Sequence, residues 1–201
     1  MVPIPSPSGQ LRADIVQMPY DADAQVEFTV QKMREYALAD ARSPEIKRDV
    51  QAAAAAYDSP LYYCLWRWVK DRMRFTTDHD LASLAGLPAD DVVEILVRPI
   101  DISRQHAFTD ESGKVRGDCD DYTMYLACLL TAAGIPCTFT AVAADPHVAN
   151  EYSHIYVCAY PRGEAIRLPL DASHGVQPGW ETENRLGKRK EWPVSEGGYW
   201  A

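Results

Sequence analysis

The sequence predicts an α+β domain in which one central helix packs on an antiparallel sheet. Ahead of residue 137 the apolar residues recur mostly with the helical period, and from residue 137 to residue 170 they alternate with a period of two. A run of helices followed by a run of strands is typical of domains in which helices cover one face of a sheet.

Three helices are expected before residue 76, and each follows a starting signal. Ser43 precedes Pro44, and serine caps helices while proline fits the first helical position. The same Ser-Pro pair precedes the third helix, and two aspartates precede the first. The expected helices are residues 24–39, 44–57 and 61–75.

A fourth helix is expected in GDCDDYTMYLACLLTAAGIP, where Cys119 stands among three aspartates. Carboxylates in the first turn favour a helix amino terminus, and Gly134 and Pro136 end the helix. The apolar face of this helix is broad, so we expect it at the centre of the fold. Residues 76–114 are interpreted as connections, and loops this long tend to be functional.

Three strands are expected after the central helix, at residues 137–144, 153–160 and 164–170. Their short connections indicate an antiparallel meander. The segments on either side of the predicted domain show no clear period. The expected division is an extended proline-rich arm at 1–20, the domain at 21–175 and an irregular tail at 176–201.

The charge and the apolar pattern exclude several classes of protein. A net charge of −9 argues against a nucleic-acid partner, because that binding needs a basic surface. No window holds the roughly 18 apolar residues that span a bilayer, so no membrane partner is expected. The first ten residues lack the pattern of a secretory signal, which predicts a cytoplasmic protein.

The number and spacing of the cysteines argue against a disulfide framework and against a zinc site, and leave one candidate for a reactive thiol. There are five, an odd number, and none forms a CxxC pair. Four lie inside apolar segments, where cysteine is usually a small buried hydrophobe. Cys119 alone is bracketed by polar residues and glycine, so it is the candidate nucleophile.

His154 and Asp171 are the candidate partners of Cys119. His154 lies near the start of the second predicted strand, and Asp171 lies just past the end of the third. Neighbouring antiparallel strands can bring the two within hydrogen-bond distance, and the helix can bring Cys119 to the same edge. These are the nucleophile, the base and the orienting residue of covalent catalysis.

The three aspartates beside Cys119 oppose formation of its thiolate. A helix amino terminus and a nearby imidazolium lower the pKa of a thiol, whereas neighbouring carboxylates raise it. We therefore expect Asp118, Asp120 and Asp121 to turn away from the sulfur and bond N–H groups of the first turn. His154 would then supply most of the activation.

The stretches GDCDDYTMYLACLLTAAGIP, SHIYV and LPLDAS, in this order, resemble the transglutaminase-like superfamily of cysteine enzymes. The resemblance covers roughly residues 25 to 175 and looks closest to small members encoded by bacteria and their phages. It implies a papain- or transglutaminase-like core, with Cys119 as nucleophile, His154 as general base and acid, and Asp171 as orienter of the imidazole. No cofactor or metal is required by this triad.

The function implied by the resemblance is attack of the thiolate on a peptide or isopeptide amide, followed by resolution of a thioester. Water is favoured over an amine by analogy with small microbial relatives. Two alternatives stay open: a phage virion or assembly protein whose triad is idle or used once, and a module that binds peptides without cleaving them. The expected partners are a peptide or protein substrate and, for a phage protein, other virion proteins; the expected location is then the host cytoplasm or the virion.

Three further assignments concern the surroundings of the triad. The backbone N–H of Cys119 and the side chain of Gln105 are the candidate donors to an oxyanion. His174 is a competing base, although it lies in a loop beyond the third strand. The aspartates around Cys119 do not have the spacing of a calcium loop, so no metal site is expected.

Overall fold

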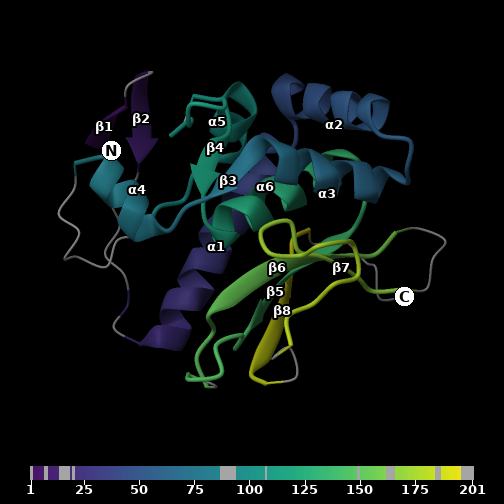
Figure 1. The fold of residues 1–201 in the computed structure, drawn as a ribbon. Helices are drawn as coiled ribbons and strands as arrows, with labels where there is room; N and C mark the ends of the chain where they lie inside the picture. The colour runs from purple at the N-terminus through teal and green to yellow at the C-terminus, as the bar shows by residue number, and fades with distance from the viewer. Residues whose placement is uncertain are drawn as a thin grey trace.

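The computed structural model describes residues 2–6, 9–13, 19, 21–86, 94–106, 108–148, 150–161, 166–183 and 187–195. This part of the chain has a mixed α+β fold with six helices, two small two-stranded sheets and one four-stranded sheet. The helices gather on one side of the four-stranded sheet, as Figure 1 shows. The predicted order of helices and then strands is confirmed for the main sheet.

The first three predicted helices are present as α1 (Ala22–Asp40), α2 (Pro44–Ala56) and α3 (Leu61–Arg72). The Ser43 hydroxyl caps α2 by accepting the N–H of Ile46 at 3.2 Å. The Ser-Pro signal ahead of α3 does not work in the same way. Pro60 itself is the N-cap there, without a side-chain cap bond, and the helix begins at Leu61, where the sequence predicts its start.

Helix α3 ends three residues earlier than the sequence predicts. Met73–Phe75 form the strand β3, which pairs in parallel with β4 (Val115–Gly117). Met73 lies opposite Val115, and both are fully buried. The pairing joins segments about forty residues apart, so the local helical pattern could not indicate it. Its effect is to hold the chain that leads directly into the central helix.

The predicted connection contains two short helices, α4 (Asp78–Leu84) and α5 (Pro99–Arg104). The segment 94–98, which leads into α5, contains the buried side chains of Ile95 and Val97. Two of its backbone N–H groups donate hydrogen bonds to carboxylates and not to a neighbouring strand. Ile95 donates to Asp78 at 2.9 Å, and Val97 donates to Asp121 at 2.6 Å. Buried N–H groups need such acceptors, so these two acids serve the fold.

The central helix is α6 (Cys119–Ala132), and every residue from Asp121 to Leu130 is buried. It contacts α1, α2 and α3 on its sides and the strands β5 and β6 beneath. Its buried polar groups are paired, since the Tyr125 hydroxyl donates to Asp49 at 2.7 Å. The predicted position of this helix is confirmed.

The main sheet has the order β7-β6-β5-β8 and is antiparallel throughout. Three strands form the predicted meander: β5 (Cys137–Val142), β6 (His154–Ala159) and β7 (Leu168–Leu170). Residues 162–165, predicted to be part of the third strand and the turn before it, lie outside the described residues.

The fourth strand, β8 (Arg189–Pro193), comes from the segment predicted as an irregular tail. It pairs with β5 and continues the sheet beyond the meander. Helix α1 holds it, because Lys190 pairs with Glu27 and the Trp192 indole donates to the same carboxylate at 2.8 Å. A single strand of five mostly polar residues carries too little alternation to be found in the sequence.

The amino-terminal arm contains a two-stranded antiparallel hairpin, formed by β1 (Val2–Ser6) and β2 (Gly9–Ala13). Among the helices described, none combines the length and the apolar character that crossing a bilayer requires.

Candidate functional site

The amino terminus of α6 is fixed by a reciprocal cap around Cys119. The Asp118 side chain accepts the N–H of Asp120 at 3.0 Å, and the Asp121 side chain accepts the N–H of Asp118 at 3.3 Å. Gly117 allows this arrangement: a Cβ at that position would lie 2.5 Å from the Asp121 carboxylate. Cys119 is thereby the first residue of the helix.

Two hydrogen bonds connect this end of the helix to strand β6. Cys119 and Thr123 are four residues apart and share one face of α6. The Thr123 hydroxyl donates to the backbone carbonyl of Ile155 at 3.0 Å, and the backbone N–H of Ile155 hydrogen-bonds the Cys119 sulfur. The residue before Ile155 is His154, so this docking brings the histidine to the helix end that carries the cysteine.

The imidazole of His154 is held by Asp171. Its Nε2 lies 2.7 Å from Oδ2 of Asp171, and the two side chains are 8% and 1% exposed. Burial works against the charged carboxylate, but the hydrogen bond and charge of His154, with donors from the turn, lower the pKa of Asp171 to about 2. An ionised carboxylate only accepts, so Nε2 carries the proton and Nδ1 is the basic nitrogen of the neutral ring.

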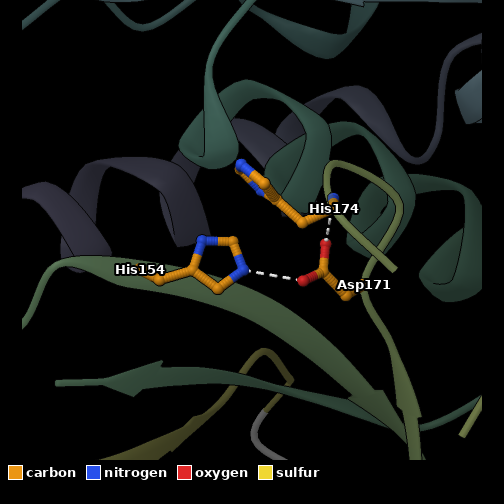
Figure 2. Close-up of side chains that lie close together, drawn as sticks. All are labelled: His154, Asp171 and His174. Atoms are coloured by element: carbon orange, nitrogen blue, oxygen red, sulfur yellow. Dashed lines mark hydrogen bonds and ion pairs between the residues drawn. The ribbon is translucent and has the colours of Figure 1, made fainter. Parts of the chain in front are cut away.

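The turn after β7 orients the Asp171 carboxylate. Oδ1 accepts the N–H of Ser173 at 2.9 Å, the hydroxyl of Ser173 at 2.8 Å and the N–H of His174 at 2.9 Å. Trp66 of α3 donates its indole N–H to the Asp171 carbonyl at 2.8 Å. Figure 2 shows the result: Oδ2 faces His154, and the second nitrogen of the His154 ring points away from the aspartate.

Cys119 and His154 line the same pocket, which has a volume of about 300 Å³. Gln25 of α1 and Tyr152, two residues before β6, contribute further walls. The pocket is also acidic, because it is lined by Glu94, Asp118 and Asp120. The structure therefore pairs His154 with Asp171 and places His154 and Cys119 in the lining of one pocket.

The environment of Cys119 favours the neutral thiol. Burial raises the pKa of Cys119 well above its ordinary value, the charges of Asp120 and Asp118 raise it further, and the N–H of Ile155 acts in the opposite direction. The sulfur hydrogen-bonds the Asp120 carboxyl at 3.6 Å. The expectation that all three aspartates turn away from the sulfur is therefore wrong for Asp120, although Asp118 and Asp121 do bond backbone N–H groups.

Several of the carboxyl groups in this cluster hold protons more tightly than usual. Burial, the charges of Asp118 and Glu94 and a hydrogen bond with Glu94 raise the pKa of Asp120 well above its ordinary value. Burial and the charge of Glu94 raise the pKa of Asp118 to about 6. Buried carboxyl groups that repel one another bind their protons more tightly.

Two groups of side chains bring three possible metal-ligand atoms within 4.8 Å of one another. One is His154, Asp171 and His174, and the other is Asp118, Cys119 and Asp120. Hydrogen bonds within the protein already engage members of both groups: the Asp171 carboxylate in the first and the cap and thiol contacts in the second.

The structure corrects the assignment of Gln105 as an oxyanion donor. Gln105 ends α5 in a left-handed conformation, and its side-chain amide donates to the Gly113 carbonyl at 3.1 Å, away from the pocket lining. The glutamine that lines the pocket is Gln25, whose amide also donates to the Pro19 carbonyl at 2.7 Å. Its position in the first turn of a predicted helix gave no signal of this.

No family model and no curated protein matches the chain. Fold and site together define a mixed α+β protein with a cysteine at the start of its central helix and a histidine–aspartate pair formed by the first residue of β6 and the residue after β7.

Proposed function

We propose that the chain is a transglutaminase-like cysteine hydrolase or acyltransferase that acts on a peptide or isopeptide amide. The observation that carries the proposal is the buried pair of His154 and Asp171, 2.7 Å apart, whose histidine shares a pocket with Cys119. In such a site the carboxylate fixes the tautomer of the imidazole, and the imidazole moves the proton of the nucleophile. The papain- or transglutaminase-like core is part of this proposal.

The first half of the reaction transfers the acyl group to the enzyme. Nδ1 of His154 takes the proton of the Cys119 thiol as the sulfur attacks the carbonyl carbon. Because the resting thiol is protonated, this transfer occurs during the attack. The N–H groups of the first turn of α6 lack helical acceptors and can stabilise the oxyanion. The imidazolium then protonates the leaving amine, and a thioester remains on Cys119.

The second half releases the acyl group. Water, or an acceptor amine, attacks the thioester while Nδ1 of His154 takes its proton. Collapse of the second intermediate returns the proton to the sulfur and frees a carboxylic acid or a new amide. Asp171 stabilises each imidazolium without being protonated, as its low pKa requires.

A second candidate is a module that binds a peptide in this pocket without cleaving it. The observation that favours this function is the raised pKa of Cys119, together with the contact between its sulfur and Asp120. If the Cys119 thiol never loses its proton, the cysteine can still line a pocket that binds a peptide. The two candidates differ in one property, namely whether Cys119 can be acylated.

Acylation by an activated ester tests the proposal without knowledge of the substrate. The chain is mixed with p-nitrophenyl acetate, nitrophenolate release is followed, and the acetylated residue is located by mass spectrometry. We expect a burst of about one equivalent on Cys119, followed by loss of the acetyl group to water or to an added primary amine. The amine arm distinguishes a transferase from a hydrolase.

Three variants serve as controls for this experiment. Cys119→Ser should abolish the burst, and His154→Ala should slow it by about 100-fold or more, as expected for loss of a general base. Cys137→Ser changes a buried cysteine outside the pocket lining and should leave the burst intact. Acetylation of Cys119 at the same rate with and without His154 would rule out the proposed mechanism.

A further inference from the structure

We propose that His174 is a positioning residue, whose neutral imidazole holds the His154–Asp171 pair in its reactive geometry. This inference rests on the proposed function and adds a fourth side chain to the machinery. It uses the geometry of the turn after β7, where the aspartate and this second histidine lie three residues apart.

The His174 ring fills the space between His154 and an aromatic side chain of β3. Its centroid lies 4.9 Å from that of His154 at an interplanar angle of 85°, and 4.8 Å from that of Phe75 at 69°. Such edge-to-face contacts restrict the rotation of the rings that make them. Figure 2 shows the two imidazoles next to one another beside Asp171, with their planes steeply inclined. The His154 ring is thus held at its edge by Asp171 and against a neighbouring ring by His174.

A chain of hydrogen bonds fixes the tautomer of His174. The Ser173 hydroxyl has one proton, and it donates this proton to the Asp171 carboxylate at 2.8 Å. The same hydroxyl lies 3.0 Å from Nδ1 of His174, so Nδ1 must be the donor in that contact. The order of donation is His174 to Ser173 to Oδ1 of Asp171, while His154 donates to Oδ2. Both oxygens of the carboxylate are therefore oriented by a histidine, one of them through a hydroxyl.

Burial and the charges around His174 favour the neutral form of its ring. Burial has the largest effect and lowers the pKa of His174. The charges of His154 and Lys70 lower this pKa further, whereas the charge of Asp171 raises it. These three are the charged groups that act on the ring from β6, from α3 and from its own turn. Protonation of His174 would place a second cation against the imidazolium that forms on His154 during the reaction, and like charges disfavour this.

The side chain of His174 can be tested separately from its backbone. Any replacement except proline keeps the N–H that donates to Asp171. His174→Ala removes both the ring contact and the bond to Ser173, whereas His174→Phe keeps an aromatic ring that cannot titrate. Each variant is checked for folding by near-ultraviolet circular dichroism, and the rate of Cys119 acylation by p-nitrophenyl acetate is measured against pH.

At pH 7 we expect His174→Ala to lower the acylation rate by about 10-fold, less than the about 100-fold that a 1 Å misplacement of a reacting group can cost. His174→Phe should stay within about 3-fold of the unmodified chain at this pH and should lose activity less steeply below about pH 6.5, the ordinary pKa of histidine. In nuclear magnetic resonance titrations, His154→Ala should raise the pKa of His174.

Outcomes that overturn this inference differ from those that overturn the proposed function. If His154→Ala slows acylation while His174→Ala reacts at the unmodified rate, only the role of His174 is wrong. The same holds if His174→Phe keeps the acid limb of the unmodified chain, or if the pKa of His174 does not respond to His154→Ala. If Cys119 is not acylated in the unmodified chain, both proposals are wrong.

Discussion

The immediate neighbours of Cys119 satisfy the needs of a helix end at a cost to the reactivity of the thiol. Asp118 and Asp121 bond backbone N–H groups that would otherwise lack acceptors. Asp120 has no such backbone role among the contacts described, because its carboxyl meets the sulfur and Glu94 instead. Of the three aspartates, it is therefore the one whose charge most directly controls the proton of the nucleophile.

Replacing Asp120 with asparagine should make Cys119 more reactive. The substitution keeps the size of the side chain and removes a carboxyl that raises the pKa of the thiol. A fall of one pKa unit increases the thiolate fraction of a mostly protonated thiol about ten-fold, so we expect alkylation at pH 7 to rise several-fold. Glu151→Gln, at an exposed acid outside the pocket lining, is the control and should leave the rate unchanged. Equal or slower alkylation of Asp120→Asn would contradict this account.

Among the elements, the junction between β4 and α6 determines where the nucleophile lies. Strand β4 ends at Gly117, the cap begins at Asp118, and the buried Asp121 joins this junction to Val97. The helix then meets β6 through Thr123. A change at this junction should therefore affect both the stability of the chain and the position of the sulfur.

Gly117→Ala should destabilise the protein and slow the reaction of Cys119. A Cβ there would lie 2.5 Å from one carboxylate oxygen of Asp121 and 2.8 Å from its Cβ, so the capping residue must move. Overpacking of this kind typically costs about 1–3 kcal/mol. Chemical denaturation and the rate of Cys119 alkylation measure the two effects. The comparison variant is Gly113→Asn, at a positive φ with open space around it, which strains the backbone without a clash and should leave the rate of Cys119 alkylation unchanged.

Elements with a strong local pattern could be predicted from the sequence, and elements that depend on distant partners could not. Ser43 and the aspartate before residue 119 indicate helix starts, and the alternation of apolar residues after residue 136 indicates the meander. Strands β3 and β8 are three and five residues long, and they are strands because they pair with β4 and β5, respectively. The same distinction holds in the site, where the strand positions predicted that His154 and Asp171 meet, but nothing in the sequence predicted that Gln25 would line the pocket.

At the scale of the whole molecule, the carboxyl groups near α6 determine how stability depends on pH. Burial and the charge of Asp118 raise the pKa of Asp78 to about 8, and that of Asp118 is raised to about 6. A folded chain with raised carboxyl pKa values holds protons that the unfolded chain has already released. The free energy of unfolding therefore falls as the pH rises from about 4 to 8. Asp171 has the opposite effect, because its pKa is lowered to about 2. Its contribution to the free energy of unfolding is lost as the pH falls below about 4.

We expect the melting temperature to be higher at pH 5 than at pH 8. Each unit of raised pKa corresponds to about 1.4 kcal/mol, and 1 kcal/mol shifts the melting temperature of a chain this size by about 2–4 °C, so a difference of several degrees should be measurable. His174 opposes this trend near pH 6, since its pKa is lowered. Asp78→Asn should flatten the dependence while its amide oxygen still accepts the N–H of Ile95. A melting temperature that rises from pH 5 to pH 8 would show that these carboxyls are charged in the folded state.

The central claim is that His154 moves the proton of Cys119, and alkylation measures this without any substrate. The rate of carboxamidomethylation at Cys119 is determined at pH 7 by peptide mass spectrometry after iodoacetamide treatment, for the unmodified chain and for His154→Ala. Our account predicts that His154→Ala lowers this rate by about 100-fold. Equal rates with and without the imidazole would contradict it.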